Sequence, residues 1–147
     1  MTQDEAIQII ENCRPKDIQY KLKGNKLVQD VIDSCSRLPL AIAVIGSLKL
    51  ENDEDWQNVM KVMMKRDSTS KPQDDYRTNL FNAFEFSIKR LHPELADLFH
   101  SLGVFKAVKI PLQSIISLWQ QDNKLEAEEK LKELNCKSLI TFDDQAK

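Results

Sequence analysis

The sequence predicts a mainly α-helical protein built in two halves. Apolar residues recur with helical spacing along most of the chain. Only 3 Gly and 5 Pro occur among the 147 residues, which is too few for the many turns of a large β-sheet. Residues 67–75 form the longest segment without an aliphatic or aromatic side chain, so we expect a linker there. This linker separates a domain at residues 1–66 from a domain at residues 76–147.

The first half begins with the signals of two helices. Thr2 and Glu5 form a capping box, in which each side chain bonds the backbone N–H of the other residue, and Pro15 ends the helix that they begin. A polar connection, residues 23–25, precedes the second helix. The apolar stripes of the two helices are Ala6, Ile9, Ile10 and Cys13, then Leu27, Val28, Val31, Ile32 and Cys35.

Two further helices complete the first half. Pro39 begins the third helix, at a position where a missing backbone N–H costs nothing. Residues 40–48 are apolar almost all round, which is typical of a central helix covered by its neighbours, and Gly46 indicates a close approach of another helix. Asn52 or Asp53 caps the fourth helix. The inward face of this helix carries Trp56, Val59, Met60 and Met63.

The second half also consists of helices, followed by one strand. Its helical stripes lie at residues 80–91, 93–102, 111–119 and 124–135. Ser138 to Phe142 is predicted to be a strand by its composition. No partner strand follows it in the sequence, so we expect an incomplete hairpin at this end.

Charge and hydropathy exclude several classes of function. Residues 1–75 carry 11 basic and 13 acidic side chains, and residues 76–147 carry 10 of each. Neither half has the excess of Lys and Arg that a phosphate backbone requires, which disfavours nucleic acid as a partner. The longest apolar run, Leu38 to Ile45, is too short to cross a bilayer, and Met1 is followed by polar residues rather than by a signal peptide. We expect a cytoplasmic protein that has no membrane partner.

The sequence contains no motif for catalysis. It lacks the pattern GxxxxGK[ST], and hence the loop and lysine that hold nucleotide phosphates, and it lacks the Gly-x-Ser-x-Gly turn of serine hydrolases. Cys13, Cys35 and Cys136 do not have metal-ligand spacing. We therefore expect neither enzymatic activity nor a metal site.

One motif and the segments that follow it resemble a known family. Residues 35–42, C-S-R-L-P-L-A-I, resemble the C-x-G-L-P-L-A motif of the NB-ARC family. That family comprises the nucleotide-switch modules of apoptotic protease-activating factors and plant disease-resistance receptors. Residues 45–48 resemble the I-G-x-L-L continuation of its apoptotic members. Further landmarks follow in the order and spacing of the family: Trp56 to Val59, residues 87–91, residues 98–105, Ile110-Pro111 with Leu118-Trp119, and residues 137–140.

The resemblance implies a fold, a ligand and a role. Residues 1–66 would be a four-helix ARC-type domain, and residues 76–147 a winged-helix domain. The motif proline of the family lies against bound adenine, which makes Leu38, Pro39 and Leu40 the candidates for nucleotide contact. ADP or ATP would bind only together with a P-loop nucleotide-binding domain, in cis or in trans. The chain would be the regulatory part of an ADP/ATP-dependent switch in apoptosis or innate immunity. It would pack against that domain and control homo-oligomerisation of the parent protein.

The chain departs from the family pattern in two places. Arg37 stands where the family has the glycine before Leu-Pro-Leu, and a backbone with positive φ there would disfavour an arginine. The histidine that senses the β-phosphate in the family would fall after Phe142, and neither His92 nor His100 matches it.

A stand-alone winged-helix module that binds nucleic acid or another protein is the alternative interpretation. Its recognition helix would be residues 124–135. Four glutamates accompany three lysines in that helix, and their charge would repel a phosphate backbone.

Overall fold

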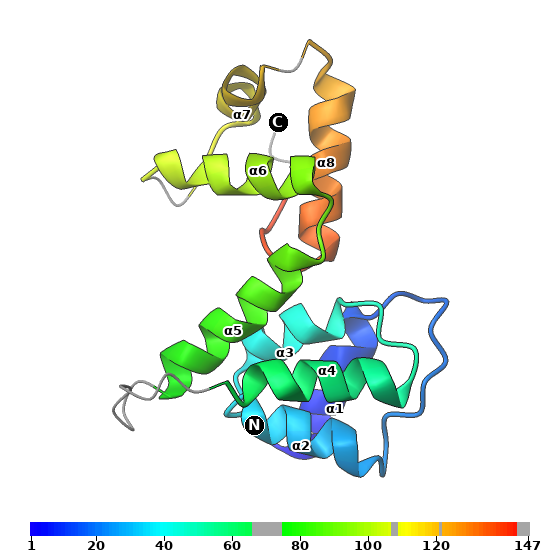
Figure 1. Ribbon diagram of the computed structural model, residues 1–147. Helices are drawn as coiled ribbons and strands as arrows, with labels where there is room; N and C mark the ends of the chain where they lie inside the picture. Colours follow the sequence, from blue (N-terminus) through cyan, green and yellow to red (C-terminus); the bar gives the residue numbers. More distant parts are fainter. Residues whose placement is uncertain (66–74, 107–108, 121, 144–147) are drawn as a thin grey trace. The chain divides into compact units, whose positions relative to one another are not determined.

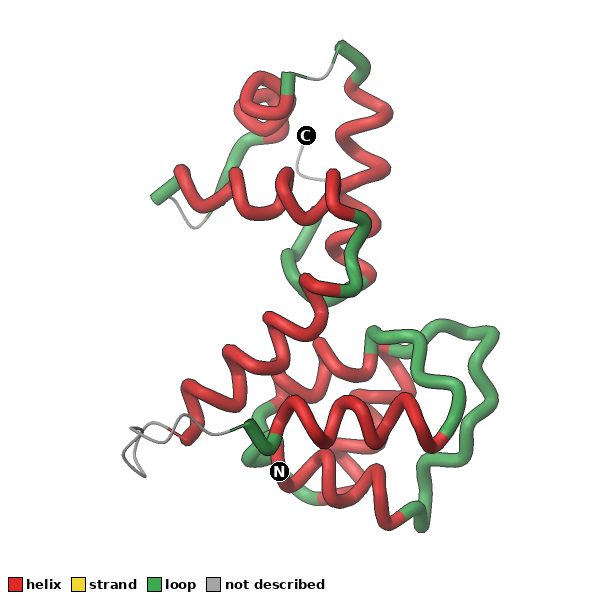
Figure 2. Tube along the Cα trace, viewed as in Figure 1, coloured by secondary structure: helices red, strands yellow, loops and turns green. Residues whose placement is uncertain are grey.

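The computed structural model describes residues 1–65, 75–106, 109–120 and 122–143. The chain divides into two compact units, Met1–Ile88 and Lys89–Lys147. Within the described residues every regular element is a helix and no strand is formed (Figure 2). The prediction of a mainly α-helical protein is therefore confirmed.

The described residues of the first unit form four α-helices and nearly all of a fifth (Figure 1). They are α1 (Gln3–Cys13), α2 (Lys26–Ser34), α3 (Pro39–Gly46), α4 (Asp53–Met63) and α5 (Asp75–Lys89). Helix α1 packs against α3, and α2 packs against α4. The structure shows that the four helices expected before residue 66 are all formed.

The helix ends follow the local signals of the sequence. The backbone N–H of Thr2 donates to the Glu5 carboxylate at 2.7 Å, and the N–H of Glu5 donates to the Thr2 hydroxyl at 3.3 Å. The bond from the Thr2 N–H lowers the pKa of the Glu5 carboxyl. Asn52, rather than Asp53, caps α4, because its side chain accepts from the N–H of Asp55 at 3.0 Å.

The core of the first unit surrounds α3. Five of the eight residues of α3 are buried, as expected for a helix that is apolar all round. Trp56 of α4 is only 2% exposed and stacks on the ring of Tyr20, with ring centroids 6.0 Å apart. The burial predicted for the stripes of α1, α2 and α4 is confirmed for most of their residues: Ala6, Ile10, Val28, Val31, Ile32, Cys35, Trp56, Val59 and Met63.

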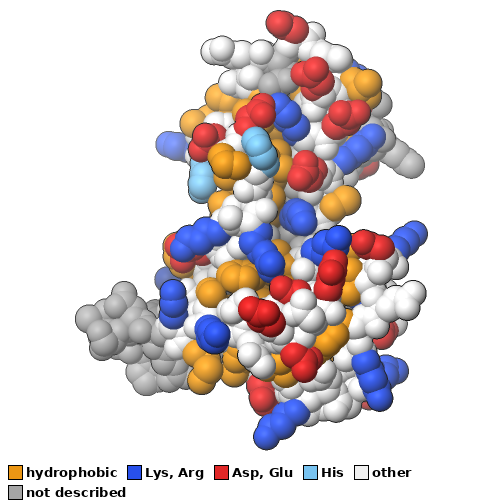
Figure 3. Space-filling view, turned by 45° about the vertical axis from the view of Figure 1, so that its right-hand side comes forward, with side chains coloured by type: hydrophobic (Ala, Val, Ile, Leu, Met, Phe, Trp, Pro, Cys, Tyr) orange, Lys and Arg blue, Asp and Glu red, His pale blue; other side chains and the backbone are white. Residues whose placement is uncertain are grey.

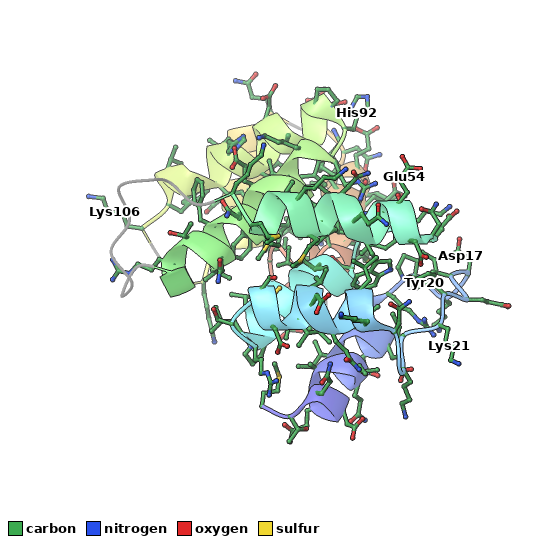
Figure 4. The ribbon with its side chains drawn as sticks, turned by 60° about the horizontal axis from the view of Figure 1, so that its bottom comes forward. Asp17, Tyr20, Lys21, Glu54, His92 and Lys106 are labelled. Atoms are coloured by element: carbon green, nitrogen blue, oxygen red, sulfur yellow. The ribbon has the colours of Figure 1, made fainter. Side chains whose placement is uncertain are left out.

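Tyr20 fixes the long connection between α1 and α2. Its hydroxyl donates to the Asp53 carboxylate at the start of α4 and accepts from the Asn25 amide at 2.7 Å. Arg14 donates to the Tyr20 carbonyl at 3.0 Å. Burial, together with the bond to Asp53, raises the pKa of the Tyr20 hydroxyl. Figure 4 shows Tyr20 beside the N-terminal end of α4, where Glu54 is labelled.

Helix α5 belongs to the first unit, whereas the sequence placed its apolar stripe in the second half. Ala83 is fully buried in the first core, and Leu80, Phe84 and Phe86 pack against it. The first compact unit thus continues to Ile88 instead of ending at residue 66. Of the expected linker at residues 67–75, all but Asp75, which begins α5, lies outside the described residues.

In the described part of the second unit, three α-helices and a short 3-10 helix are formed. They are α6 (Pro93–Ser101), the 3-10 helix Leu102–Val104, α7 (Leu112–Trp119) and α8 (Lys124–Cys136). Trp119 is 6% exposed, and its indole N–H donates to the Leu98 carbonyl at 3.1 Å and the Ser101 hydroxyl at 3.0 Å. These bonds attach α7 to α6. The buried residues of this core are Leu91, Leu95, Ile115, Trp119, Ala127, Leu131 and Leu134.

The strand predicted at Ser138 to Phe142 does not form. Ser138 has a left-handed backbone with φ 57°, and the N–H groups of Ser138 and Leu139 bond the carbonyls of Asn135 and Leu134 at 3.0 and 3.2 Å. This pattern is a Schellman motif, which ends α8 and turns the chain. Leu139, Ile140 and Phe142 then pack against the core of the second unit. Its apolar side chains thus contribute to this core, and within the described residues its backbone pairs with no strand.

We predict that Gly46→Ala destabilises the fold by about 1–3 kcal/mol, the usual cost of overpacking. A Cβ at Gly46 would lie 2.9 Å from the Cα of Ile10, so the backbone of α1 would have to move. Chemical denaturation measures the change. Gly103→Ala is the matched control, because a Cβ there meets no heavy atom within 4 Å. Equal stabilities of the two variants would show that α1 and α3 are not in tight contact.

Candidate functional site

The residues expected to touch nucleotide lie where the chain enters α3. We call Leu38, Pro39 and Leu40 the corner. Leu38 is the N-cap of α3, with extended backbone (φ −78°, ψ 119°), and Pro39 is the first residue of the helix. Leu38 is half-buried against the first core, Pro39 is exposed and Leu40 is 48% exposed. The corner thus presents apolar surface to solvent at the end of a helix that is otherwise mostly buried.

A tight turn precedes the corner and ends α2. The N–H groups of Ser36 and Arg37 bond the carbonyls of Asp33 and Ile32 at 2.9 and 3.3 Å, which is the Schellman pattern of a helix end. The N–H of Leu38 then bonds the Cys35 carbonyl at 3.1 Å and closes a four-residue turn. We call residues 35–38 the α2–α3 turn.

Arg37 adopts the backbone that favours glycine. Ser36 and Arg37 both have φ 52°, in the left-handed region. An L-residue there costs roughly 1–2 kcal/mol, which glycine avoids. The Arg37 side chain donates from Nε to Asp33 at 2.9 Å, but both side chains are about half exposed, so their pair offsets only part of that cost. The chain therefore forms a turn with positive φ at this position despite the arginine.

A side chain from α5 contacts the α2–α3 turn. Asn79 donates from Nδ2 to the Ser36 hydroxyl at 2.9 Å, across 43 residues of sequence. Asn82, three residues later, donates to the Lys65 carbonyl at the end of α4 at 3.2 Å. Sequence reasoning missed Asn79, although its spacing of four from the buried Ala83 places both on one helical face.

The chemistry available at the corner is apolar contact. A proline ring and an exposed leucine can cover one face of a flat, largely apolar group, but they offer nothing that holds a phosphate. A hollow elsewhere in the first unit, lined by Trp56, Tyr20 and Leu50 among others, has room for about one water molecule. The corner does not line that hollow. The corner therefore offers an exposed apolar surface at the start of α3 and no charged side chain of its own.

The histidines and cysteines differ in their exposure. His92 and His100 are both exposed, at the start and near the end of α6. Cys35 is fully buried, and burial raises the pKa of its thiol to about 12, while Cys136 is exposed. Among the described residues, no three His, Cys, Asp or Glu side chains are grouped as metal ligands. In the same part of the chain no helix has the length and apolar character to cross a membrane.

Comparison with known proteins identifies relatives in two groups. The chain is 32% identical to the probable disease resistance protein At4g33300 and 29% identical to disease resistance protein ADR1, both of Arabidopsis thaliana, over 97% and 87% of its own length. It is 26% identical to human apoptotic protease-activating factor 1 over 97% of its length. It spans only 18%, 16% and 11% of these proteins, respectively. No family model and no solved structure matches it.

We predict that Arg37→Gly is more stable than Arg37→Ala by about 1–2 kcal/mol. Both variants lose the pair with Asp33, so the difference does not contain that pair and reflects the backbone preferences of the two residues at positive φ. Urea denaturation of the two variants measures it. Equal midpoints would indicate that residue 37 does not hold a positive φ in solution.

We also predict that the thiols of Cys35 and Cys136 react with an aromatic disulfide reagent at different rates. Cys136 should react fast, because it is exposed, and Cys35 only when the first unit opens, because it is buried and its pKa is about 12. Stopped-flow labelling of the wild type and Cys136→Ser assigns the phases. Fast labelling of Cys35 in the native protein would contradict the burial of its thiol at the C-terminal end of α2.

Proposed function

We propose that this chain, which is homologous over most of its length to disease resistance proteins and apoptotic protease-activating factor 1, is a regulatory part of an NB-ARC nucleotide switch. Its relatives include disease resistance proteins and apoptotic protease-activating factors. In this proposal the chain serves apoptotic or innate-immune signalling. It responds to a nucleotide that another domain holds, and it catalyses no reaction itself.

The exposed corner is the observation that supports this proposal most directly. Leu40 is 48% exposed although it belongs to the helix at the centre of the first core. The Schellman end of α2 and the N-terminal proline of α3 restrict the backbone conformations that the corner can adopt. A rigid apolar surface of this kind suits contact with the adenine of ADP or ATP, while the phosphates lie on a partner domain.

The proposed partner is a P-loop nucleotide-binding domain, in cis or in trans. Its phosphate-binding loop would supply the charged contacts that the corner lacks. Nucleotide bound between the two surfaces would favour their association. Exchange of the nucleotide would then change the population of the associated state and allow homo-oligomerisation of the parent protein.

Nucleic-acid binding has less support from the structure. Lys130 of α8 lies 2.8 Å from Glu94 of α6, and Lys124 lies 3.8 Å from Glu128, so these two lysines already have acidic neighbours. On the face drawn in Figure 3, basic and acidic side chains are intermingled within each unit. A phosphate backbone would meet a mixed surface rather than a basic one.

We predict that this chain alone does not bind ADP measurably, but that it tightens ADP binding to a P-loop domain. The P-loop domain of an NB-ARC relative is titrated with ADP by calorimetry, without and with the chain. We expect the affinity to rise about tenfold, the factor that corresponds to ~1.4 kcal/mol. The physical reason is that the corner covers an adenine face that is otherwise in water.

Leu40→Ser should abolish this gain, because it removes the exposed apolar side chain of the corner. Leu125→Ser is the matched control, since Leu125 is 57% exposed but lies on α8, outside the corner. Two results would argue against the proposal: micromolar ADP binding by the chain alone, or equal effects of the two substitutions.

A further inference from the structure

The α2–α3 turn needs support beyond its own backbone. Ser36 and Arg37 are consecutive non-glycine residues with φ 52°, an arrangement that L-residues rarely adopt. In the three backbone hydrogen bonds of the turn, the acceptors are the carbonyls of Ile32, Asp33 and Cys35, which belong to α2 or its C-cap. They end α2, but they do not attach the turn to another helix.

Asn79 supplies an attachment from another helix. Its amide donates to Ser36, the first of the two left-handed residues, at 2.9 Å. Helix α5 holds Asn79, because Ala83 on the same face is fully buried in the first core.

Asn82 makes a second, similar bond one helical turn further along. It donates to the Lys65 carbonyl, just beyond the end of α4, at 3.2 Å. The two amides therefore attach α5 to two different chain reversals, but only Asn79 reaches the turn that leads into the corner. Comparing the two residues therefore distinguishes an effect on the corner, which only the Asn79 bond can have directly, from a general effect of attaching α5.

We propose that Asn79 is a positioning residue for the corner. Through Ser36 it holds the α2–α3 turn in the conformation that leaves Pro39 and Leu40 exposed. The inference rests on the proposed function, since it names a residue that sets the shape of the same adenine contact. When α5 is in place the turn is held, and when the Asn79 bond is absent the turn samples other conformations.

Backbone hydrogen exchange in the whole chain tests the positioning role. In Asn79→Leu the amides of Ser36, Arg37 and Leu38 should exchange about three to ten times faster, the range that one exposed hydrogen bond allows. Ser36→Ala should give the same increase, and the double variant should exchange no faster than either single variant. Asn79→Asp should rescue the wild-type rate, since the Ser36 hydroxyl can donate to a carboxylate instead of accepting.

Asn82→Leu is the control, because it removes an amide bond from the same helix without touching the turn. It should leave the three amides at their wild-type rates. Unchanged exchange in Asn79→Leu would overturn the inference. Equal acceleration in Asn82→Leu would also overturn it, because α5 would then act only as packing.

The ADP titration with a P-loop domain separates this inference from the proposed function. If both hold, Asn79→Leu lowers the gain in ADP affinity, Asn82→Leu does not, and Leu40→Ser abolishes the gain. If Leu40→Ser weakens ADP binding and Asn79→Leu has no effect, the proposed function stands and the positioning role is overturned. If the exchange results appear but no variant alters ADP binding, the proposed function fails while Asn79 still positions the turn.

Discussion

Burial of α3 on almost every side constrains the rest of the first unit. A helix that is apolar all round has no face for water, so neighbouring helices must cover it. Gly46 permits a tight contact with α1, since an added Cβ would meet the Ile10 backbone at 2.9 Å. Helix α5 adds Ala83 to the same core. Under this constraint α3 can reach the surface only at an end, and it does so at Pro39 and Leu40.

The strained turn follows from the same arrangement. Pro39 restricts Leu38 to an extended backbone, which is the conformation observed. Cys35, the C-cap of α2, is fully buried, so only Ser36 and Arg37 remain to turn the chain between two fixed points. Both residues take positive φ. The path of the chain between α2 and α3 therefore requires positive φ at these residues. Arg37 adopts this backbone, although glycine would do so at a lower energetic cost.

Local signals predicted the first four helices well, and long-range packing decided what they missed. Three features could be predicted from short stretches of sequence. The Thr2 capping box and the helix start at Pro39 depend on neighbouring residues, and the close approach at Gly46 follows from the lack of a side chain there. Helix α5 belongs to the first unit because Ala83 is buried in the first core. An apolar stripe predicts a helix, but it does not indicate against which core that helix packs. Residues 138–142 have strand composition, but a strand needs a partner, and α8 ends in a turn instead. The sequence located the corner at a helix start, whereas its exposure and the Asn79 contact arise from tertiary packing.

The chemistry of the corner limits what it can sense. ADP and ATP share their adenine and differ only in their phosphates, so an apolar surface that touches the base binds both equally. A surface with equal affinity for two ligands cannot shift a conformational equilibrium between them. Arg37, the cation beside the corner, is already paired with Asp33 at 2.9 Å. In the proposed function the corner would therefore contact the base of either nucleotide. Discrimination between ADP and ATP would come from groups on the partner domain that contact the phosphates.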